Sequence, residues 1–162
     1  ANGKFSQRLF DYLIKLDTYP QTVPPKSTGR EHYDEKFVIG LLRKAIRWRV
    51  MEPDIIHTVT KYTAFTISQA YEKFIKSKVQ KLFVGGGGAH NTFLMTELVR
   101  YFKDIEVLNV SDAGINEDYK EAICFAVLAN ECVHGQPAGL PNVTGARRPA
   151  ILGKICPVVK VE

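Results

Sequence analysis

The residues that first suggest chemistry are four consecutive glycines, Gly85 to Gly88, which follow a short apolar run and precede Asn91 and an amphipathic segment. This order is typical of a strand, a tight turn and the start of a helix, with Asn91 as its N-cap. Glycines tolerate positive φ and let a ligand approach the main chain. The free N–H groups at a helix start suit an anion or a nucleotide. A glycine turn without any ligand explains the pattern about equally well.

Two acidic residues follow a second strand-like segment, residues 105–110. Asp112 lies directly after it, and Glu121 lies near the start of the next helical segment. Strand, glycine turn, helix and strand in this order predict a parallel βαβ unit. Ligands of such sheets bind at the carboxyl ends of the strands, which favours a ligand at the glycine turn. Glu121 is either a site residue or a helix cap that complements the helix dipole.

A proline-rich loop, residues 19–31, holds several polar residues. Its segment from Lys26 to Gly29 is similar to the end of a P-loop, but the upstream glycines and strand that a P-loop requires are absent. The loop either lines a site or is a solvated connection, and its composition favours the connection. The polar residues concerned are Lys26, Ser27, Thr28 and Arg30.

Basic residues between Arg43 and Arg49 surround Trp48, a mixture that can bind nucleic acid. A solvated helix face with an inward-packed Trp48 is the favoured explanation, since a net charge of +5 is small for binding dominated by phosphates. His57 lacks a second ligand at metal-binding spacing, so we expect a packed or surface histidine and no metal site.

The elements that must position these residues follow from hydrophobic periodicity. A stripe from Ile55 to Phe74 predicts a helix of roughly six turns. Residues 122–133 are apolar almost all round, which predicts a central buried helix. A long irregular tail rich in glycine and proline begins at Gly135. Helical spacing predicts further helices at residues 5–17, 37–46 and 93–103.

The composition, 45% hydrophobic and 24% charged over 162 residues, is that of one ordinary globular domain with a sizeable core. Cys124, Cys132 and Cys156 are odd in number and lie among apolar residues, so we expect buried free thiols in a reducing compartment, the cytoplasm. No apolar run is long enough to span a bilayer, and no signal peptide opens the chain, so we expect no membrane partner.

Taken together, these segments resemble the C-terminal part of the anhydro-N-acetylmuramic acid kinase family, within the sugar kinase–Hsp70–actin superfamily. Four blocks carry the resemblance, and their order and spacing match the family across almost the whole chain. They are Pro24–Glu31 (PPKSTGRE), Gly86–Asn91 (GGGAHN), Asp112–Ala122 (DAGINEDYKEA) running into Phe125–Ala129 (FAVLA), and Leu140–Gly153 (LPNVTGARRPAILG).

The resemblance implies a fold and a reaction. The fold is α/β: residues 1–162 would form a single domain, the partial C-terminal lobe of an actin-like ATPase (ribonuclease H-like) fold, helix-rich with a small parallel βαβ core and without its first strands. The family transfers phosphate from ATP, with Mg²⁺, to the 6-oxygen of 1,6-anhydro-N-acetylmuramic acid and opens the anhydro ring hydrolytically, in the recycling of cell-wall sugars. The cleft between two lobes would hold both substrates.

The resemblance also implies roles for residues. Gly86, Gly87, Gly88 and Asn91 match the family's adenosine motif, and Glu121 matches a glutamate that faces the sugar and its attacking water. The block containing Lys26, Ser27, Thr28 and Arg30, together with Asp112, would line the cleft. The tail block resembles a brace for the sheet.

The sequence departs from the family pattern in two places: Ser111-Asp112 stands where the family usually has an Asp-Glu pair, and Arg147 stands where it usually has a small polar residue. The family's phosphate hairpins and general-base aspartate lie upstream of this region, and nothing here replaces them. We therefore expect this chain alone to be inactive, because phosphoryl transfer needs charge stabilisation at the phosphates and a base that reaches the water. The Mg²⁺ ligands are not identifiable in the sequence.

Two functions remain open: the C-terminal lobe of an anhydro-sugar kinase, or a non-catalytic ATP-binding or interaction module of the same superfamily. The sheet predicted here has an open edge, which a missing lobe or a second chain would cover, so a homodimer is one expected arrangement. The expected partners are thus ATP, an anhydro-amino-sugar and the rest of a two-lobe protein, and not nucleic acid.

Overall fold

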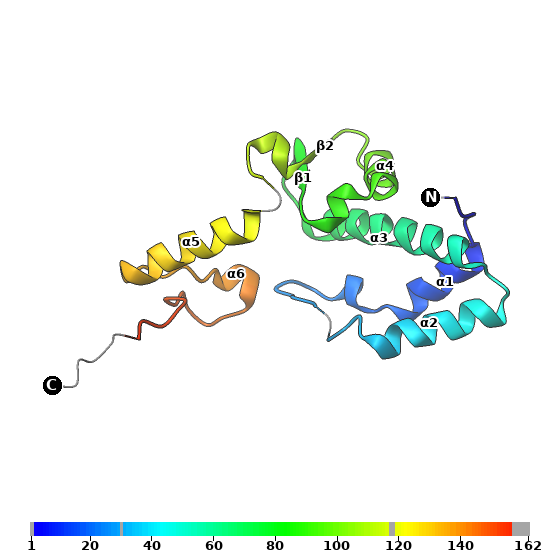
Figure 1. The fold of residues 1–162 in the computed structure, drawn as a ribbon, viewed down its shortest axis with the longest axis horizontal. Helices are drawn as coiled ribbons and strands as arrows, with labels where there is room; N and C mark the ends of the chain where they lie inside the picture. The colour runs from blue at the N-terminus through cyan, green and yellow to red at the C-terminus, as the bar shows by residue number, and fades with distance from the viewer. Residues whose placement is uncertain (1, 30, 117–118, 157–162) are drawn as a thin grey trace. The chain divides into compact units, whose positions relative to one another are not determined.

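The computed structural model describes residues 2–29, 31–116 and 119–156, and the chain divides into two compact units. The first unit comprises Ala1–Val23 and Thr28–Gly114, and the second comprises Pro24–Ser27 and Ile115–Glu162. Figure 1 labels the helices and strands of both units. Those of the first unit are α1 (Gln7–Leu16), α2 (Glu35–Arg47), α3 (Glu52–Phe74), β1 (Lys81–Val84), α4 (Thr92–Tyr101) and β2 (Glu106–Asn109). Those of the second unit are α5 (Lys120–Val133) and α6 (Pro141–Thr144).

Helix starts in the first unit follow from side chains that satisfy exposed backbone N–H groups. The Ser6 hydroxyl accepts from the Leu9 N–H at 3.4 Å at the start of α1. The Asp34 carboxylate accepts from the Phe37 N–H at 2.8 Å at the start of α2. Pro53 stands in the first turn of α3, where its missing N–H costs nothing. The predicted long helix is confirmed, with 23 residues.

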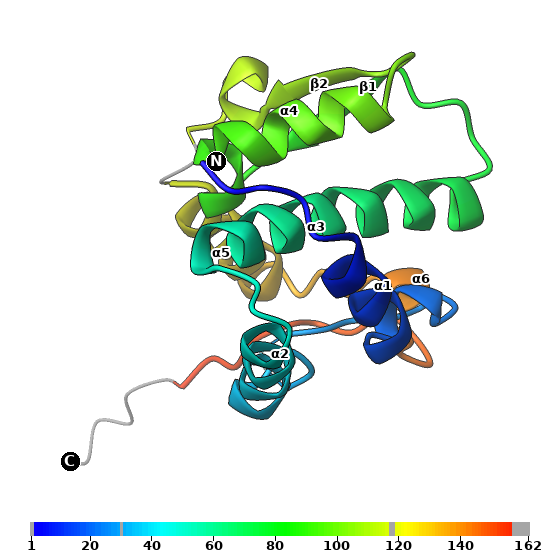
Figure 2. The ribbon, with the colours of Figure 1, turned by 90° about the vertical axis from the view of Figure 1, so that its right-hand side faces the viewer.

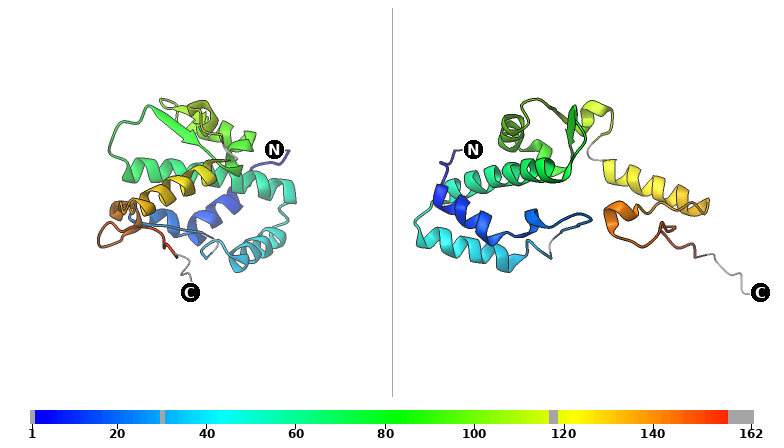
Figure 3. Two further views of the ribbon diagram at one scale, coloured as in Figure 1. Left: turned by 60° about the vertical axis from the view of Figure 1, so that its left-hand side comes forward. Right: turned by 180° about the vertical axis from the view of Figure 1, so that it is seen from behind.

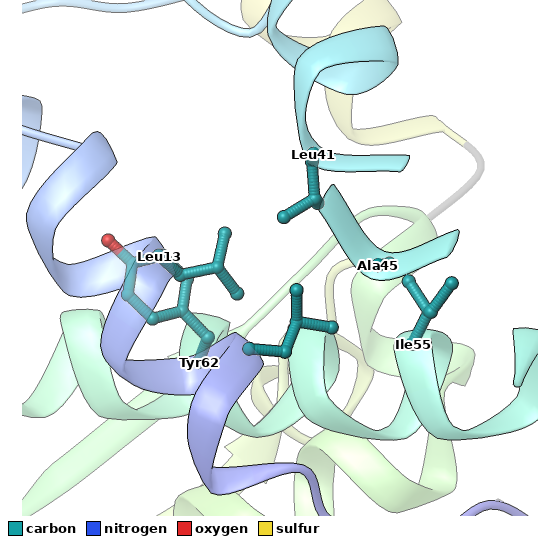
Figure 4. Close-up of a cluster of buried hydrophobic side chains, with 6 residues drawn as sticks. Leu13, Leu41, Ala45, Ile55 and Tyr62 are labelled. Carbon is teal, nitrogen blue, oxygen red and sulfur yellow. The ribbon is translucent and has the colours of Figure 1, made fainter. Parts of the chain in front are cut away.

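The first unit has two cores, one on each side of α3 (Figure 2). One core lies between α1, α2 and α3, and Figure 4 shows Leu13, Leu41, Ala45, Ile55 and Tyr62 converging there. The other core joins α3 to α4 and the strands through Ala64, Leu98 and Phe102. Because α3 contributes to both cores, it is the element on which the unit is assembled.

The two strands pair in parallel, with Leu82 opposite Val107 and Val84 opposite Asn109. This register confirms the predicted parallel βαβ unit, in which α4 connects the strands. The carboxyl ends of β1 and β2 therefore reach the same edge of the sheet.

Trp48 at the end of α2 is half-buried, as predicted for an inward-facing side chain. Its ring packs edge to face with the Tyr12 ring, with 5.5 Å between the ring centroids, and the guanidinium carbon of Arg8 lies 4.4 Å from the Trp48 ring centroid. The tryptophan at the centre of the basic cluster thus packs against α1.

The second unit departs from the sequence prediction. Figure 3 shows α5 followed by the short α6 and an irregular chain, and none of the α5 residues is buried. Phe125 is 69% exposed. The prediction of a central buried helix is wrong, because the described residues of the second unit form one other helix, the four-residue α6, which is too short to cover α5.

The cysteines are also less buried than predicted. Cys124 and Cys156 are exposed and Cys132 is half-buried, because they lie on α5 and in the tail, and all three are free thiols. The tail is tied by hydrogen bonds from the N–H groups of Ala138 and Gly139 to the Ala150 carbonyl, both at 3.2 Å. Among the described residues, no helix is long and apolar enough to cross a membrane.

Candidate functional site

The glycine turn directly follows β1 and leads into α4 through a short 3-10 helix, Gly87–His90. Gly86 has φ +80° and ψ −172°, a backbone conformation that residues other than glycine rarely adopt. The first internal bond of the turn runs from the Ala89 N–H to the Gly86 carbonyl at 2.9 Å. The N–H groups of Gly87 and Gly88 precede this first donor, so they lie at the exposed start of the turn.

Open space surrounds the backbone at this turn. A methyl group added to Gly86 or Gly87 would meet no described atom beyond its chain neighbours within 4 Å, and one added to Gly88 would lie 3.6 Å from a Leu94 methyl. The protein's own packing therefore does not explain a glycine at position 87, whereas close approach of a ligand would explain it.

Asn91 is the N-cap of α4, as predicted: its side-chain oxygen accepts from the Leu94 N–H at 3.1 Å. This bond fixes the position at which the turn becomes helix. Asn91 thus has a structural task, and its amide N–H₂ is the group that remains for a ligand.

Asp112 lies at the same edge of the sheet, in the 3-10 turn that follows β2. Its carboxylate accepts from the Asn109 backbone N–H at 2.8 Å, and Gly114 ends the turn with φ +81°. The structure therefore places Asp112 and the glycines where two parallel strands end, as the sequence predicted.

The other predicted site residues fall in different places. Thr28 is exposed and belongs to the first unit, whereas Lys26, Ser27 and Glu121 belong to the second unit, in which Glu121 is exposed in the first turn of α5. Arg30 lies outside the described residues. The structure thus places Asp112 at the same sheet edge as the glycine turn, whereas Lys26, Ser27 and Glu121 belong to the other unit.

Within the second unit, two of the blocks singled out from the sequence meet. A methyl group on Gly145 would lie 3.5 Å from the Pro25 side chain, and Gly145 itself has φ +75°. The loop block therefore packs against the tail block at this glycine.

No group of three or more His, Cys, Asp or Glu side chains in the described part of the chain could hold a metal ion. His57 is a packed histidine, its ring centroid 4.5 Å from that of Phe93, which agrees with the prediction. Burial, and then the neighbouring Lys61 charge, lower the pKa of His57.

A buried carboxylate that was not predicted from the sequence, Asp17, lies at the C-terminal end of α1. Its side chain accepts hydrogen bonds from the Tyr33 hydroxyl at 2.9 Å and the Tyr62 hydroxyl at 3.0 Å. Burial, together with the Asp17 charge and hydrogen bond, raises the pKa of both tyrosines. A signal was available: a carboxylate at a helix C-terminus faces the negative end of the dipole, so it needs compensating partners.

Comparison with known proteins gives a consistent result. The family model described as anhydro-N-acetylmuramic acid kinase matches residues 1–158. A protein of that name from Caldanaerobacter subterraneus is 38% identical over 157 residues, covering 96% of this chain and 39% of the relative. Another from Rippkaea orientalis is 40% identical over 156 residues, covering 96% and 40%. A third, from Salinibacter ruber, is 41% identical over 139 residues, covering 85% and 35%.

The chain thus spans about two fifths of the length of these relatives.

Proposed function

The chain belongs to the anhydro-N-acetylmuramic acid kinase family, and we propose that it is the C-terminal lobe of an ATP-dependent kinase acting on 1,6-anhydro-N-acetylmuramic acid. The observation that carries this proposal is the family match over residues 1–158, which includes a glycine turn open to solvent at the carboxyl edge of a parallel sheet. In this proposal the two units belong to one lobe of an actin-like ATPase fold.

The proposed reaction opens the anhydro ring and phosphorylates the sugar in one catalytic cycle. Water attacks C1, the bond between C1 and O6 breaks, and O6 takes the γ-phosphoryl group of ATP, so that ADP leaves and N-acetylmuramic acid 6-phosphate forms. A base must take the proton of the water, and positive groups must stabilise the charge on the phosphates.

The residues of this chain would divide these tasks. Gly86, Gly87, Gly88 and Asn91 would hold the adenosine part of ATP. Glu121 would orient the sugar and the attacking water. The remaining proposed cleft residues are Lys26, Ser27, Thr28, Arg30 and Asp112.

Mg²⁺ would accompany the ATP phosphates, as in other phosphoryl transfers. No cluster of ligands for a metal is found among the described residues, so we assign it no residue of this chain. We place the general base and the phosphate hairpins in the part of the relatives that this chain does not match, and we expect the 162-residue chain alone to be inactive. Use of ATP and an anhydro sugar of the cell wall favours a cytoplasmic enzyme of wall-sugar recycling.

The test is ADP release by the native protein with 1,6-anhydro-N-acetylmuramic acid, compared with N-acetylmuramic acid and N-acetylglucosamine. We expect turnover only with the anhydro sugar, and a fall of about 100-fold or more in Glu121→Gln, the scale of a lost group that acts on the water. ATP binding without turnover of any anhydro sugar would instead support a non-catalytic module. Turnover by the isolated 162-residue chain that Glu121→Ala abolishes would refute the expected inactivity.

A further inference from the structure

The feature that the proposed function leaves unused is the carboxylate of Asp17, which is 3% exposed at the end of α1. One oxygen accepts from the Tyr19 backbone N–H at 3.1 Å and lies 3.3 Å from His32 Nε2. The other oxygen accepts from the Tyr33 and Tyr62 hydroxyls. Burial of a carboxylate is unfavourable unless hydrogen bonds replace its water, and these contacts supply that replacement.

The bonding capacity of Asp17 is filled by the protein. A carboxylate has about four lone-pair positions, and the four contacts, with Tyr19, His32, Tyr33 and Tyr62, occupy them. A cavity of about 590 Å³ adjoins Asp17 between α1, α2 and α3, but its lining is mainly apolar. The arrangement therefore suits a residue that holds protein segments together, and not one that binds a ligand.

The partners of Asp17 come from both ends of one loop. Tyr19 stands at its start and His32 and Tyr33 at its end. The rings reinforce this closure, with His32 centred 5.2 Å from Tyr19 and 4.9 Å from Tyr33. Tyr62, by contrast, is on α3, outside the loop.

The segment between these ends contains the block Lys26–Arg30. At the start of the loop, Lys73 of α3 donates to the side chain of Gln21 at 2.9 Å. At its end, the His32 N–H donates to the Gly29 carbonyl at 3.3 Å. A loop whose two ends share one buried acceptor has fewer conformations to lose when it binds a substrate, which raises affinity.

We propose that Asp17 is a positioning residue: by clamping both ends of the loop 19–33 it limits the conformations of the Lys26–Gly29 segment, which the proposed function assigns to the substrate cleft. This inference rests on the proposed kinase function for its effect on catalysis. The clamp itself does not depend on that function and can be measured separately.

Tyr33 and Tyr62 form a matched pair for the test. Both hydroxyls donate to the same carboxylate oxygen, at 2.9 and 3.0 Å, but only Tyr33 is on the loop. Tyr33→Phe and Tyr62→Phe each remove one hydrogen bond and keep the ring. A merely structural carboxylate would respond equally to both changes.

The experiment compares the two variants in the native protein by limited trypsin cleavage after Lys26 and by steady-state kinetics. We expect Tyr33→Phe to speed cleavage about tenfold and to lower kcat/KM for the anhydro sugar about tenfold, with Tyr62→Phe within about twofold of the wild type in both. Asp17→Asn should reproduce the Tyr33→Phe effects. Its oxygen and amide cannot accept all four contacts.

Equal effects of Tyr33→Phe and Tyr62→Phe on cleavage would overturn the clamp. Faster cleavage with unchanged kinetics on an active enzyme would overturn the role of Asp17 in ordering the Lys26–Gly29 segment for substrate binding. If the wild-type protein turns over no anhydro sugar, the kinase proposal fails, whereas the cleavage rates still decide whether Asp17 holds the loop.

Discussion

The two units of the chain use apolar side chains in opposite ways. In the first unit, Leu9, Leu13 and Leu98 are at most 1% exposed, and each lies in a core formed by at least two elements. In the second unit, Phe125 and Val133 of α5 are 69% and 68% exposed. An apolar helix therefore indicates a need for packing partners and does not show which elements supply them. An isolated helix of 14 residues is only marginally stable.

The largest effect that tests this comparison is expected at Leu98. Leu98→Ala should lower the free energy of unfolding by about 3 kcal/mol, because it leaves a cavity beside Ala64 and Phe102. Urea unfolding of the 162-residue chain measures this, with Val99→Ala, at a 54% exposed neighbour, as the control. A loss below about 1 kcal/mol would show that the core around Ala64, Leu98 and Phe102 is not closely packed.

A second test concerns the polar part of the first core, Tyr62. Its raised pKa means that the folded state keeps a proton that the unfolded state releases above pH 10, so this stabilisation is complete below pH 10 and is lost as the pH rises further. Tyr62→Phe should cost about 1 kcal/mol at pH 8. That cost should fall by about 1.4 kcal/mol per pH unit above pH 10.

Urea unfolding of the wild type and Tyr62→Phe at pH 8, 10 and 11 gives this comparison. A cost that is the same at pH 8 and pH 11 would contradict a hydroxyl held protonated by burial and Asp17.

The smallest effect is expected on α5. Phe125→Ser should change the free energy of unfolding of the chain by no more than about 0.5 kcal/mol, as for other exposed substitutions. The matched change in the first unit is Phe102→Ser, at a side chain that is 6% exposed, and it should cost several times more. A cost of about 2 kcal/mol or more at Phe125 would mean that α5 is packed, so that the two units would not differ in how they bury apolar side chains.

The same contrast explains how much the sequence could predict. Local signals sufficed for the α3 stripe, for the Asn91 cap and for the strands around α4, because the residues concerned are close in sequence. The clamp at Asp17 could not be predicted in this way, since Tyr62 lies 45 positions away and its hydroxyl is one donor among many tyrosines. The exposure of α5 could not be predicted either, because hydrophobic periodicity indicates a helix but does not identify the elements that pack against it.

The residues of the candidate site also differ in whether local sequence predicts their position. Its glycines and Asp112 follow two strands that pair directly, so the sequence predicted their common edge. The order of the segments also suggests Glu121 for this edge, and the family resemblance adds Lys26 and Ser27, but local pattern gives no geometry that joins these three residues to the glycines.

Two alanine substitutions in the native protein test whether the glycine turn holds ATP. An added methyl at Gly87, or at Gly40 of α2, would meet no atom of the described residues within 4 Å apart from the adjoining backbone, so both variants should fold. We expect the Kd of ATP, measured by calorimetry, to rise at least about tenfold in Gly87→Ala, a cost of about 1.4 kcal/mol, and to stay unchanged in Gly40→Ala. Equal ATP affinity in Gly87→Ala and the wild type would contradict the account.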